Sequence, residues 1–411
     1  MKILVVNRSD SRGGAANAAY RQHKALLLEK INSKFLVKEK FICNDDSIIK
    51  AKNSNLLNLL SKTDKQIVKW YRKRQSLFST NIIPNNFVQQ INELDADIVH
   101  LHWVAGGLLK VEDIPKIKKP VVWTFHDMWM LTGGCHYDNY CNKYKVNCGK
   151  CPVLNSQTKY DLSYHRFMAK FTAIQKIKSR LVVVTPSTWL ENEVKQSNIF
   201  KGVPVLTIPN PIDNTYFKMS KNTAKKKLKI DQRKKVILFA AINSTSDKRK
   251  GFQHIKKMLK NINIKKEDYI LMIIGADKES NNDMLFGFET KYFGKLFDEK
   301  QMNIIYNASD VCIVPSEQEN LGTVIMESLS CNTPVLAFNV GGNSDLISHM
   351  KNGYLAKPFD NTDFTNGLLF VLNSLNDIDI NNYKLHIQKY NGAGIAKRYQ
   401  KLYTKIINQS L

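Results

Sequence analysis

The chain has 411 residues, of which 43% are hydrophobic, so it has the length and composition of a globular protein with two domains. Lys and Arg total 61 and Asp and Glu total 36, and the resulting net charge of +25 favours anionic partners such as phosphates. The whole chain is rich in Lys, Asn and Ile, and such a general bias in composition explains the positive charge equally well. The sequence has no long basic arm or basic-aromatic repeat, which argues against nucleic acid as a partner.

No export or membrane-spanning pattern is found in the sequence. The apolar run of residues 3–6 ends at Asn7 and Arg8, before a secretory core develops, and no apolar run is long enough to cross a bilayer. Seven cysteines in a chain without an export signal predict reduced thiols. We therefore expect a cytoplasmic protein, whose basic surface can make peripheral contact with anionic lipid at the inner face of the cell membrane.

Two predicted strands of the first half end in residues suited to ligand binding. Residues 3–6 form the first strand, and Gly13 and Gly14 precede the helix that follows it. Paired glycines let backbone approach a charged or polyhydroxyl ligand, although a plain tight turn gives the same pattern. Residues 121–125 form another buried strand, which ends at His126. Ligands gather at the carboxyl ends of parallel strands, so His126 is a candidate functional residue, with a structural histidine as the alternative.

A cysteine-rich loop, residues 133–152, follows this strand. Its four thiols resemble the ligand set of a tetrahedral zinc site, and they belong to Cys135, Cys141, Cys148 and Cys151. Only Cys148 and Cys151 have the close two-residue spacing, so paired disulfides and free buried thiols are the alternatives. A site of four thiolates leaves no open position, so a metal bound here would be structural.

The alternation of strands and helices restarts in the second half of the chain. Prolines flank Asn210, and we place the boundary between two domains there. Residues 236–240 form the first strand of this half, and Lys248, Arg249 and Lys250 follow in a polar loop. Consecutive cations at the carboxyl end of a strand suit a diphosphate, and a solvated turn is the alternative.

The most informative stretch joins a strand at residues 311–314 to a helix whose apolar spacing begins at Leu321. Glu319 falls in the loop before this helix, and Glu327 lies deeper along the helix face. Backbone amides at the start of a helix favour anions. A phosphate at that position, with hydroxyl groups beside the two acids, is what a nucleotide sugar presents.

Taken in order, these motifs resemble the retaining glycosyltransferases of the group 1 family, over nearly the whole chain. The matching motifs are Gly13-Gly14, His126-Asp127, Pro186-Ser187, residues 209–213, Lys250-Gly251, Glu319 with Glu327, and Gly341-Gly342. Residues 102–152 also resemble a subgroup found in gene clusters for bacterial cell-surface polysaccharides such as O-antigen, capsule and exopolysaccharide. The resemblance implies an α/β protein of the GT-B type, with two Rossmann-like, doubly wound domains facing each other across a cleft.

The resemblance also implies a domain organisation. Residues 1–210 would form an acceptor-side domain that carries the cysteine-rich loop, and residues 211–385 a domain that binds the nucleotide sugar. Residues 386–411 would contain a helix that packs back toward the first domain. Ile395, Tyr399, Leu402 and Ile406 give this helix one apolar face.

By the same resemblance, Glu327 binds the ribose hydroxyls and Glu319 binds the donor sugar. Lys250 neutralises the diphosphate, together with amides near Leu321 and Gly322. His126 lies beside the donor sugar near the reacting carbon. The pair Gly13-Gly14 closes over the phosphates and the acceptor side. Departure of a nucleoside diphosphate needs stabilised charge, so no cofactor is expected for catalysis.

Two positions depart from the family pattern. The family commonly has an Arg several residues before the phosphate-binding Lys, whereas residues 241–245 contain no cation. Arg249 or Lys248 is then the candidate substitute. The Gly that usually follows the first acid is Asn320 in this chain, which leaves the identity of the donor sugar open.

The function implied is that of a hexosyltransferase-type enzyme, which moves a sugar from a nucleotide-diphosphate sugar to a lipid-linked glycan acceptor in polysaccharide or lipopolysaccharide biosynthesis. A sugar-nucleotide epimerase on the same scaffold is the alternative, and it would turn over the donor without an acceptor. A remote alternative is a zinc-dependent nucleic-acid-binding protein. It accounts for the charge and the thiols but leaves the ordered strand-loop-helix motifs unexplained.

Overall fold

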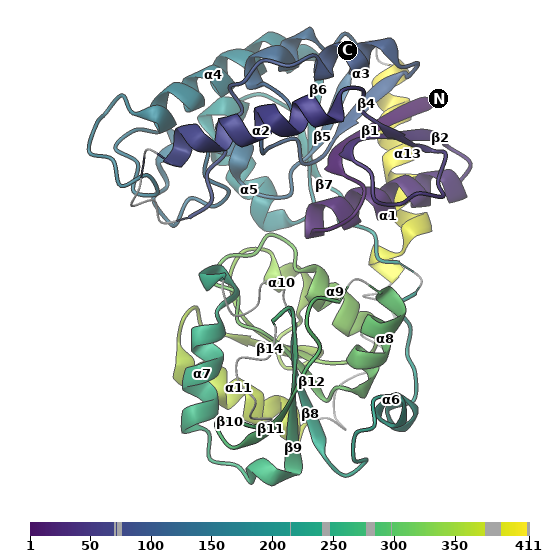
Figure 1. Cartoon of the computed structure of the whole chain (residues 1–411), viewed down its shortest axis with the longest axis vertical. Coiled ribbons are helices and arrows are strands. Elements are labelled where there is room, and N and C mark those ends of the chain that lie inside the picture. Colours follow the sequence, from purple (N-terminus) through teal and green to yellow (C-terminus); the bar gives the residue numbers. More distant parts are fainter. Residues whose placement is uncertain are drawn as a thin grey trace. The chain divides into compact units, whose positions relative to one another are not determined.

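The computed structural model describes residues 1–69, 71, 76–213, 215–240, 247–276, 284–296, 298–374 and 388–408. These residues form two compact units (Figure 1). Unit 1 comprises Met1–Pro211 and Gly392–Leu411, and unit 2 comprises Ile212–Asn391. The boundary follows the proline-flanked Asn210, and the last helix of the chain belongs to unit 1.

Unit 1 is built on a parallel sheet of seven strands in the order β3-β2-β1-β4-β5-β6-β7. The strands are β1 (Lys2–Ser9), β2 (Asn32–Glu39), β3 (Ile48–Lys50), β4 (Ile98–Leu101), β5 (Val121–Thr124), β6 (Leu181–Thr185) and β7 (Val205–Thr207). Its helices are α1 (Gly14–Leu28), α2 (Ser54–Lys69), α3 (Phe87–Glu93), α4 (Leu162–Ile177), α5 (Thr188–Gln196) and α13 (Gly392–Asn408).

Successive residues of β1 enter different cores, which explains why its strand sequence is apolar throughout. Leu4 and Val6 pack in one cluster of buried side chains. Ile3 and Val5 pack in another, together with Tyr399 of α13. Side chains alternate between the faces of a strand, so both faces of this sheet are covered by packed apolar residues. Helix α13 lies against α1, as Figure 1 shows with the yellow helix of unit 1.

Unit 2 repeats this architecture with seven strands in the order β10-β11-β9-β8-β12-β13-β14. Strand β10 pairs antiparallel with β11, and the other neighbours are parallel. The strands are β8 (Lys235–Ala240), β9 (Tyr269–Ile274), β10 (Met284–Leu285), β11 (Phe288–Tyr292), β12 (Val311–Val314), β13 (Val335–Phe338) and β14 (Gly353–Ala356). Its helices include α6 (Lys221–Lys227), α7 (Phe252–Asn261), α8 (Glu299–Ala308), α9 (Thr323–Ser330), α10 (Asn343–Leu346) and α11 (Asn361–Asn373).

Short 3₁₀ turns complete the described elements. They are η1 (Val111–Lys116), η2 (Trp129–Leu131), η3 (Lys143–Lys145), η4 (Lys178–Arg180), η5 (Asn198–Phe200), η6 (Lys248–Lys250) and η7 (Lys266–Asp268). Ser187 caps α5 by accepting a hydrogen bond from the amide of Leu190, as its position before the helix suggests. No helix in the described ranges is both long and apolar enough to cross a membrane.

Both sheets are doubly wound, and each has a point where the strand order changes direction. In unit 1 the chain winds outward on either side of β1 and β4, and in unit 2 it does so on either side of β8 and β12. Loops that leave neighbouring strands at such a point diverge, and the space between them is where ligands bind in open α/β sheets. The loops after β8 and β12 carry Lys250 and Glu319, which the sequence analysis singled out.

Candidate functional site

The loops after β8 and β12 are held together by their backbones. The amide of Glu317 donates a hydrogen bond to the carbonyl oxygen of Arg249, with N and O 2.8 Å apart. Gly251 has a φ of +73°, and a Cβ at this position would lie 1.9 Å from the carbonyl oxygen of Pro315. A side chain does not fit there, so the glycine after the cationic turn is what allows the two loops to touch.

The loop after β13 contacts the loop after β12 at Glu319. The amide of Gly342 donates to the carbonyl oxygen of Glu319, with N and O 3.3 Å apart. Gly341 has a φ of +56°, and a Cβ here would lie 1.6 Å from that same oxygen. The backbone of Glu319 is therefore fixed by the pair Gly341-Gly342, which gives these glycines a structural role next to the candidate site.

A Gly341→Ala variant is expected to lose roughly 2–4 kcal/mol of unfolding free energy, because the added methyl group meets backbone that cannot yield. Urea unfolding of the full chain measures this. Gly287→Ala is the matched control, because Gly287 also has a positive φ, +86°, but a Cβ there meets only the flexible side chain of Lys266. Equal losses in the two variants would show that backbone strain alone, and not the contact with Glu319, determines the effect.

Lys250 and Glu319 form an ion pair at this position, with Nζ and a carboxylate oxygen 2.9 Å apart. Their side chains retain 23% and 17% of their exposure, so both charges can be reached by a ligand. Asp247 caps the turn that presents Lys250, by accepting from the amide of Arg249. The fold thus brings together two predicted site residues that lie far apart in the sequence.

Arg249 and Lys248 are the candidates to replace the arginine that the family usually has before the phosphate-binding lysine. The Arg249 guanidinium pairs with the carboxylate of Asp247 at 2.7 Å, and Lys248 is exposed. The cation-free residues 241–245 lie outside the described residues. Arg249 therefore lies within the same short turn as Lys250, with an acidic partner of its own.

Helix α9 supplies the remaining predicted residues of this site. It begins at Thr323, and its N-cap residue Gly322 provides no side-chain cap, so the first amides are left for another acceptor. Leu321 and Asn320, which precede it, are buried. The helix starts two residues later than the apolar spacing suggested. Glu327 is consequently its fifth residue, little more than one turn from the start.

Glu327 is buried, with 7% of its surface exposed, and its carboxylate accepts a hydrogen bond from the hydroxyl of Tyr306 at 3.0 Å. Burial and the neighbouring carboxylate raise the pKa of Tyr306 well above its usual value, so this hydroxyl stays a donor. Tyr306 lies on α8 and was not singled out by the sequence. A tyrosine in an amphipathic helix gives no sign of which carboxylate it will meet.

In unit 1, His126 follows β5 and belongs to a row of stacked imidazoles. Its Nε2 lies 2.9 Å from Nδ1 of His102, and the two ring centroids are 5.2 Å apart. His102 stacks in turn on His100, at 4.5 Å. Burial lowers the pKa of His126 to about 4 and that of His100 to about 3. The row is therefore neutral at neutral pH and offers hydrogen bonds without charge.

Further polar contacts hold this row and the residue after it. His100 contacts the hydroxyls of Thr124, at 2.8 Å, and Tyr403, at 2.6 Å. Asp127 accepts from Nε1 of Trp103 at 2.9 Å and pairs with Nδ1 of His136 at 2.6 Å. The two residues of the motif His126-Asp127 thus have different contacts. The histidine belongs to the imidazole row, and the aspartate hydrogen-bonds residues of neighbouring loops.

Gly13 and Gly14 lie between β1 and α1 in the same unit. Gly13 is the N-cap of α1 and provides no side-chain cap. A Cβ built on either glycine would meet nothing within 4 Å. The start of α1 is therefore open on the side of these glycines, as a loop that approaches a ligand requires.

Acidification is expected to destabilise the protein between about pH 6.5 and pH 4. Burial lowers the pKa of His23 to about 4, as it does for His126. In this window the unfolded chain binds more protons than the folded one, so stability falls as pH falls, by up to ~1.4 kcal/mol per pH unit for each such histidine. Urea unfolding at pH 7, 6 and 5 measures the slope. His23→Gln should flatten it, whereas a change at the exposed His165 should not; an unchanged slope in His23→Gln would refute the assignment.

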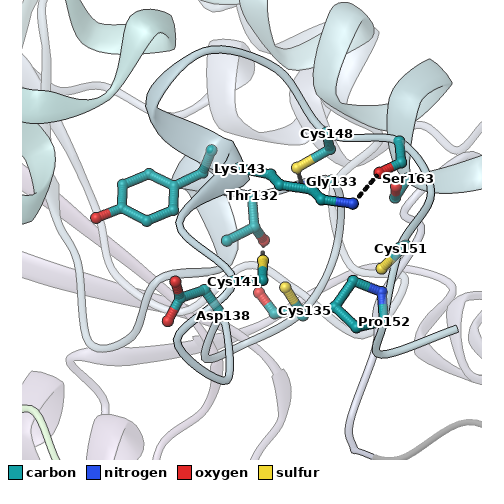
Figure 2. Close-up of a pocket in the computed structure, with 12 residues that line it drawn as sticks. Thr132, Gly133, Cys135, Asp138, Cys141, Lys143, Cys148, Cys151, Pro152 and Ser163 are labelled. Carbon is teal, nitrogen blue, oxygen red and sulfur yellow. Dashed lines mark hydrogen bonds between the residues drawn. The ribbon is translucent and has the colours of Figure 1, made fainter. Parts of the chain in front are cut away.

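The four clustered cysteines of unit 1 line one pocket (Figure 2). All of them are free thiols, so the disulfide alternative does not hold in this structure. As their side chains stand, the described residues contain no group of three or more His, Cys, Asp or Glu placed to hold a metal ion. The tetrahedral zinc ligand set that the spacing suggested is therefore not formed by these side chains as they stand.

Comparison with known proteins identifies the family. Residues 220–384 match the model of the glycosyl transferases group 1, and residues 61–216 match that of glycosyltransferase family 4. The chain is a group 1 glycosyltransferase. The two matched regions lie on either side of the boundary between unit 1 and unit 2, so both units contribute to this assignment.

Curated relatives of this glycosyltransferase are distant. An uncharacterized glycosyltransferase of Haemophilus influenzae is 29% identical over 150 residues, which cover 34% of this chain and 38% of that protein. One of Methanocaldococcus jannaschii is 22% identical over 74% of this chain and 82% of that protein. The putative colanic acid biosynthesis glycosyl transferase WcaC of Escherichia coli is 26% identical over 38% of this chain and 40% of that protein.

Solved structures establish the fold of this glycosyltransferase. Sucrose-phosphate synthase of Thermosynechococcus elongatus has a TM-score of 0.69 at 17% identity, with 99% of each chain covered. The glycosyltransferase WaaG, involved in lipopolysaccharide biosynthesis, has a TM-score of 0.58 at 15% identity, with 99% of this chain and 98% of that chain covered. With two Rossmann-like parallel α/β sheets, the chain has the GT-B fold, and the predicted fold class is confirmed.

Proposed function

We propose that this glycosyltransferase transfers a sugar, with retention of configuration, from a nucleotide-diphosphate sugar to a glycan acceptor that is carried on a lipid. The observation that carries the proposal is the ion pair of Lys250 and Glu319 beside the uncapped start of α9, with Glu327 one turn deeper. These groups lie at the point in unit 2 where the strand order changes direction. A cation suits the diphosphate of a nucleotide sugar, and the two carboxylates suit the hydroxyl groups of its sugar and its ribose.

The diphosphate would replace Glu319 as the partner of the Lys250 ammonium group, and it would accept hydrogen bonds from the first amides of α9. Glu319, freed from its partner, would then accept hydrogen bonds from hydroxyls of the donor sugar. Glu327, held by Tyr306, would accept those of the ribose. Charge develops on the diphosphate as its bond to the sugar breaks, so stabilisation by Lys250 and the amides acts on the bond-breaking step.

Unit 1 would supply the acceptor side of the reaction. A neutral His126 would offer a hydrogen bond to a sugar hydroxyl without contributing a positive charge. Gly13 and Gly14, with open space beside them, would let backbone approach the phosphates and the acceptor. Asn320, in place of the family's usual glycine, would influence which donor sugar is accepted. No catalytic metal is required by this scheme.

The functions of known relatives support a role in cell-surface polysaccharide synthesis. The Escherichia coli enzyme that galactosylates a diphosphoundecaprenol-linked sugar is 29% identical over 33% of this chain and 36% of that protein. HepE of Anabaena, with a TM-score of 0.61 and 14% identity, has been solved with UDP-glucose. A lipid-linked acceptor and the net charge of +25 together favour an enzyme that acts while bound to the anionic inner face of the cell membrane.

The test is to incubate the purified protein with UDP-, GDP- and ADP-sugars, with and without a membrane extract, and to measure release of nucleoside diphosphate. Acceptor-dependent release from one donor is the expected result. Conversion of the donor sugar without any acceptor would favour the epimerase alternative. A folded protein that neither binds nor cleaves any of these donors would overturn the proposal.

A further inference from the structure

The thiol pocket, defined by Cys135, Cys141, Cys148 and Cys151, is a feature that the proposed reaction does not use. Figure 2 shows the four sulfur atoms around one space at the edge of the loops that follow η2. These loops run from residue 132 to 161, and η3 is the only helix or strand described within them. A segment of this length without regular structure needs another source of stability in a compact domain.

A backbone amide is directed at one of the sulfurs. The amide of Gly133 donates to Sγ of Cys148, with N and S 3.1 Å apart. Amide donors stabilise a negatively charged sulfur more than a neutral one. This contact would therefore favour a thiolate at Cys148.

Other potential ligands near the pocket are already engaged. Both ring nitrogens of His136 have partners, Asp127 at 2.6 Å and Ser79 at 2.9 Å. The carboxylate of Asp138 accepts from the amides of Tyr140 and Asn142, at 3.1 and 2.9 Å. The four sulfurs are therefore the ligand set that the pocket offers.

A buried lysine lies next to the pocket. Lys170 is fully buried, and its ammonium group donates to the carbonyl oxygens of Trp129 and Thr132. Burial lowers the pKa of Lys170 to about 7, and negative charge on Cys135 and Cys148 acts in the opposite direction. Four thiolates around a divalent cation carry a net charge of −2, and a neighbouring ammonium partly offsets that charge.

We propose that the thiol pocket binds one thiophilic divalent cation, Zn²⁺, through four thiolates, and that this ion holds the cysteine-rich loop in place. The side chains as they stand are not grouped to hold an ion, so binding requires the four sulfurs to move closer together. Each thiol gives up its proton when its sulfur bonds the metal, so four protons leave per ion bound. The inference is independent of sugar transfer, because a four-thiolate site has no open position for catalysis.

The first experiment uses the full chain, prepared without chelator and without a metal-affinity tag. Elemental analysis is expected to find about one zinc per chain. After removal of the metal under reducing conditions, Co²⁺ should bind with the intense thiolate-to-metal absorption and visible bands of tetrahedral coordination, and Zn²⁺ should displace it. The midpoint of thermal unfolding should fall on chelation and recover when Zn²⁺ alone is added.

Matched serine variants locate the site. Cys141→Ser is expected to lose stoichiometric zinc and the Co²⁺ absorption, and it is the mildest of the four changes because Cys141 is the least buried. Cys43→Ser, which removes an exposed thiol elsewhere in unit 1, should retain both. Folding of each variant is checked by circular dichroism.

Two results with the wild-type chain would overturn the proposal. One is a folded wild-type chain that has no zinc, binds no Co²⁺ and titrates with all seven thiols free once unfolded. The other is a thiol count lower by two or four, which would show disulfides in place of a metal. Zinc that persists in Cys141→Ser but not in Cys43→Ser would equally contradict it. Each readout is a direct measurement of metal or thiol, so none depends on an active enzyme.

Discussion

A Glu319→Ala variant is expected to lower the rate of sugar transfer by about 10²–10³-fold while changing the affinity for nucleoside diphosphate little. The carboxylate is placed to contact the sugar and not the nucleotide, and it pairs with the ammonium group of Lys250 at 2.9 Å. Removing it deletes the sugar contact but leaves Lys250 available to the diphosphate. Turnover under saturating donor, and calorimetric titration with the nucleoside diphosphate, separate the two effects.

The matched control for this prediction is Glu317→Gln, on the same loop. Glu317 contacts His254 at 3.2 Å and is not among the groups proposed to touch the substrate. Its replacement should leave turnover within a few fold of wild type. If Glu319→Ala weakened nucleoside diphosphate binding as strongly as turnover, the assignment of Glu319 to the sugar would be wrong.

Glu327→Ala is expected to have the opposite profile, with nucleotide affinity reduced about 10- to 100-fold. A hydrogen bond to a charged group contributes roughly 1.5–3 kcal/mol, and loss of the ribose contacts removes that contribution in both the ground and transition states. The Kd of the nucleoside diphosphate should therefore rise, whereas kcat at saturating donor should change much less. Thermal stabilisation by the nucleotide gives a second measure of the same loss.

Tyr306→Phe tests whether the position of Glu327 matters as well as its presence. The variant removes the hydroxyl that donates to the Glu327 carboxylate at 3.0 Å but keeps the aromatic ring in the core. We expect a smaller loss of nucleotide affinity, of about 3- to 10-fold, from a less well oriented carboxylate. A loss as large as that of Glu327→Ala would mean that Tyr306 acts through more than this one hydrogen bond.

The fold, and the approach of Lys250 to Glu319, could be predicted from the sequence for a physical reason. Buried parallel strands are apolar throughout, and their carboxyl ends lie at one edge of the sheet. Lys250 and Glu319 each follow such a strand, so their approach could be expected before the strand order was known.

Pairings that depend on register could not be predicted from the sequence. The stacking of His102 on His126 follows from the pairing of Leu101 with Trp123, which places the residues after β4 and β5 side by side. The contact of Tyr306 with Glu327 depends on how α8 packs on α9. Cysteine spacing placed four thiols in one loop, but the sequence alone did not exclude disulfides.

The return of α13 to unit 1 affects the order in which the protein can fold during synthesis. Residues 392–408 are made after all of unit 2, yet Tyr403 contacts His100 in the core of unit 1. Until those residues leave the ribosome, one face of the unit 1 sheet lacks the cover that Ile395 and Tyr399 provide. Unit 2, by contrast, is continuous in sequence. The second unit synthesised can therefore complete its core before the first.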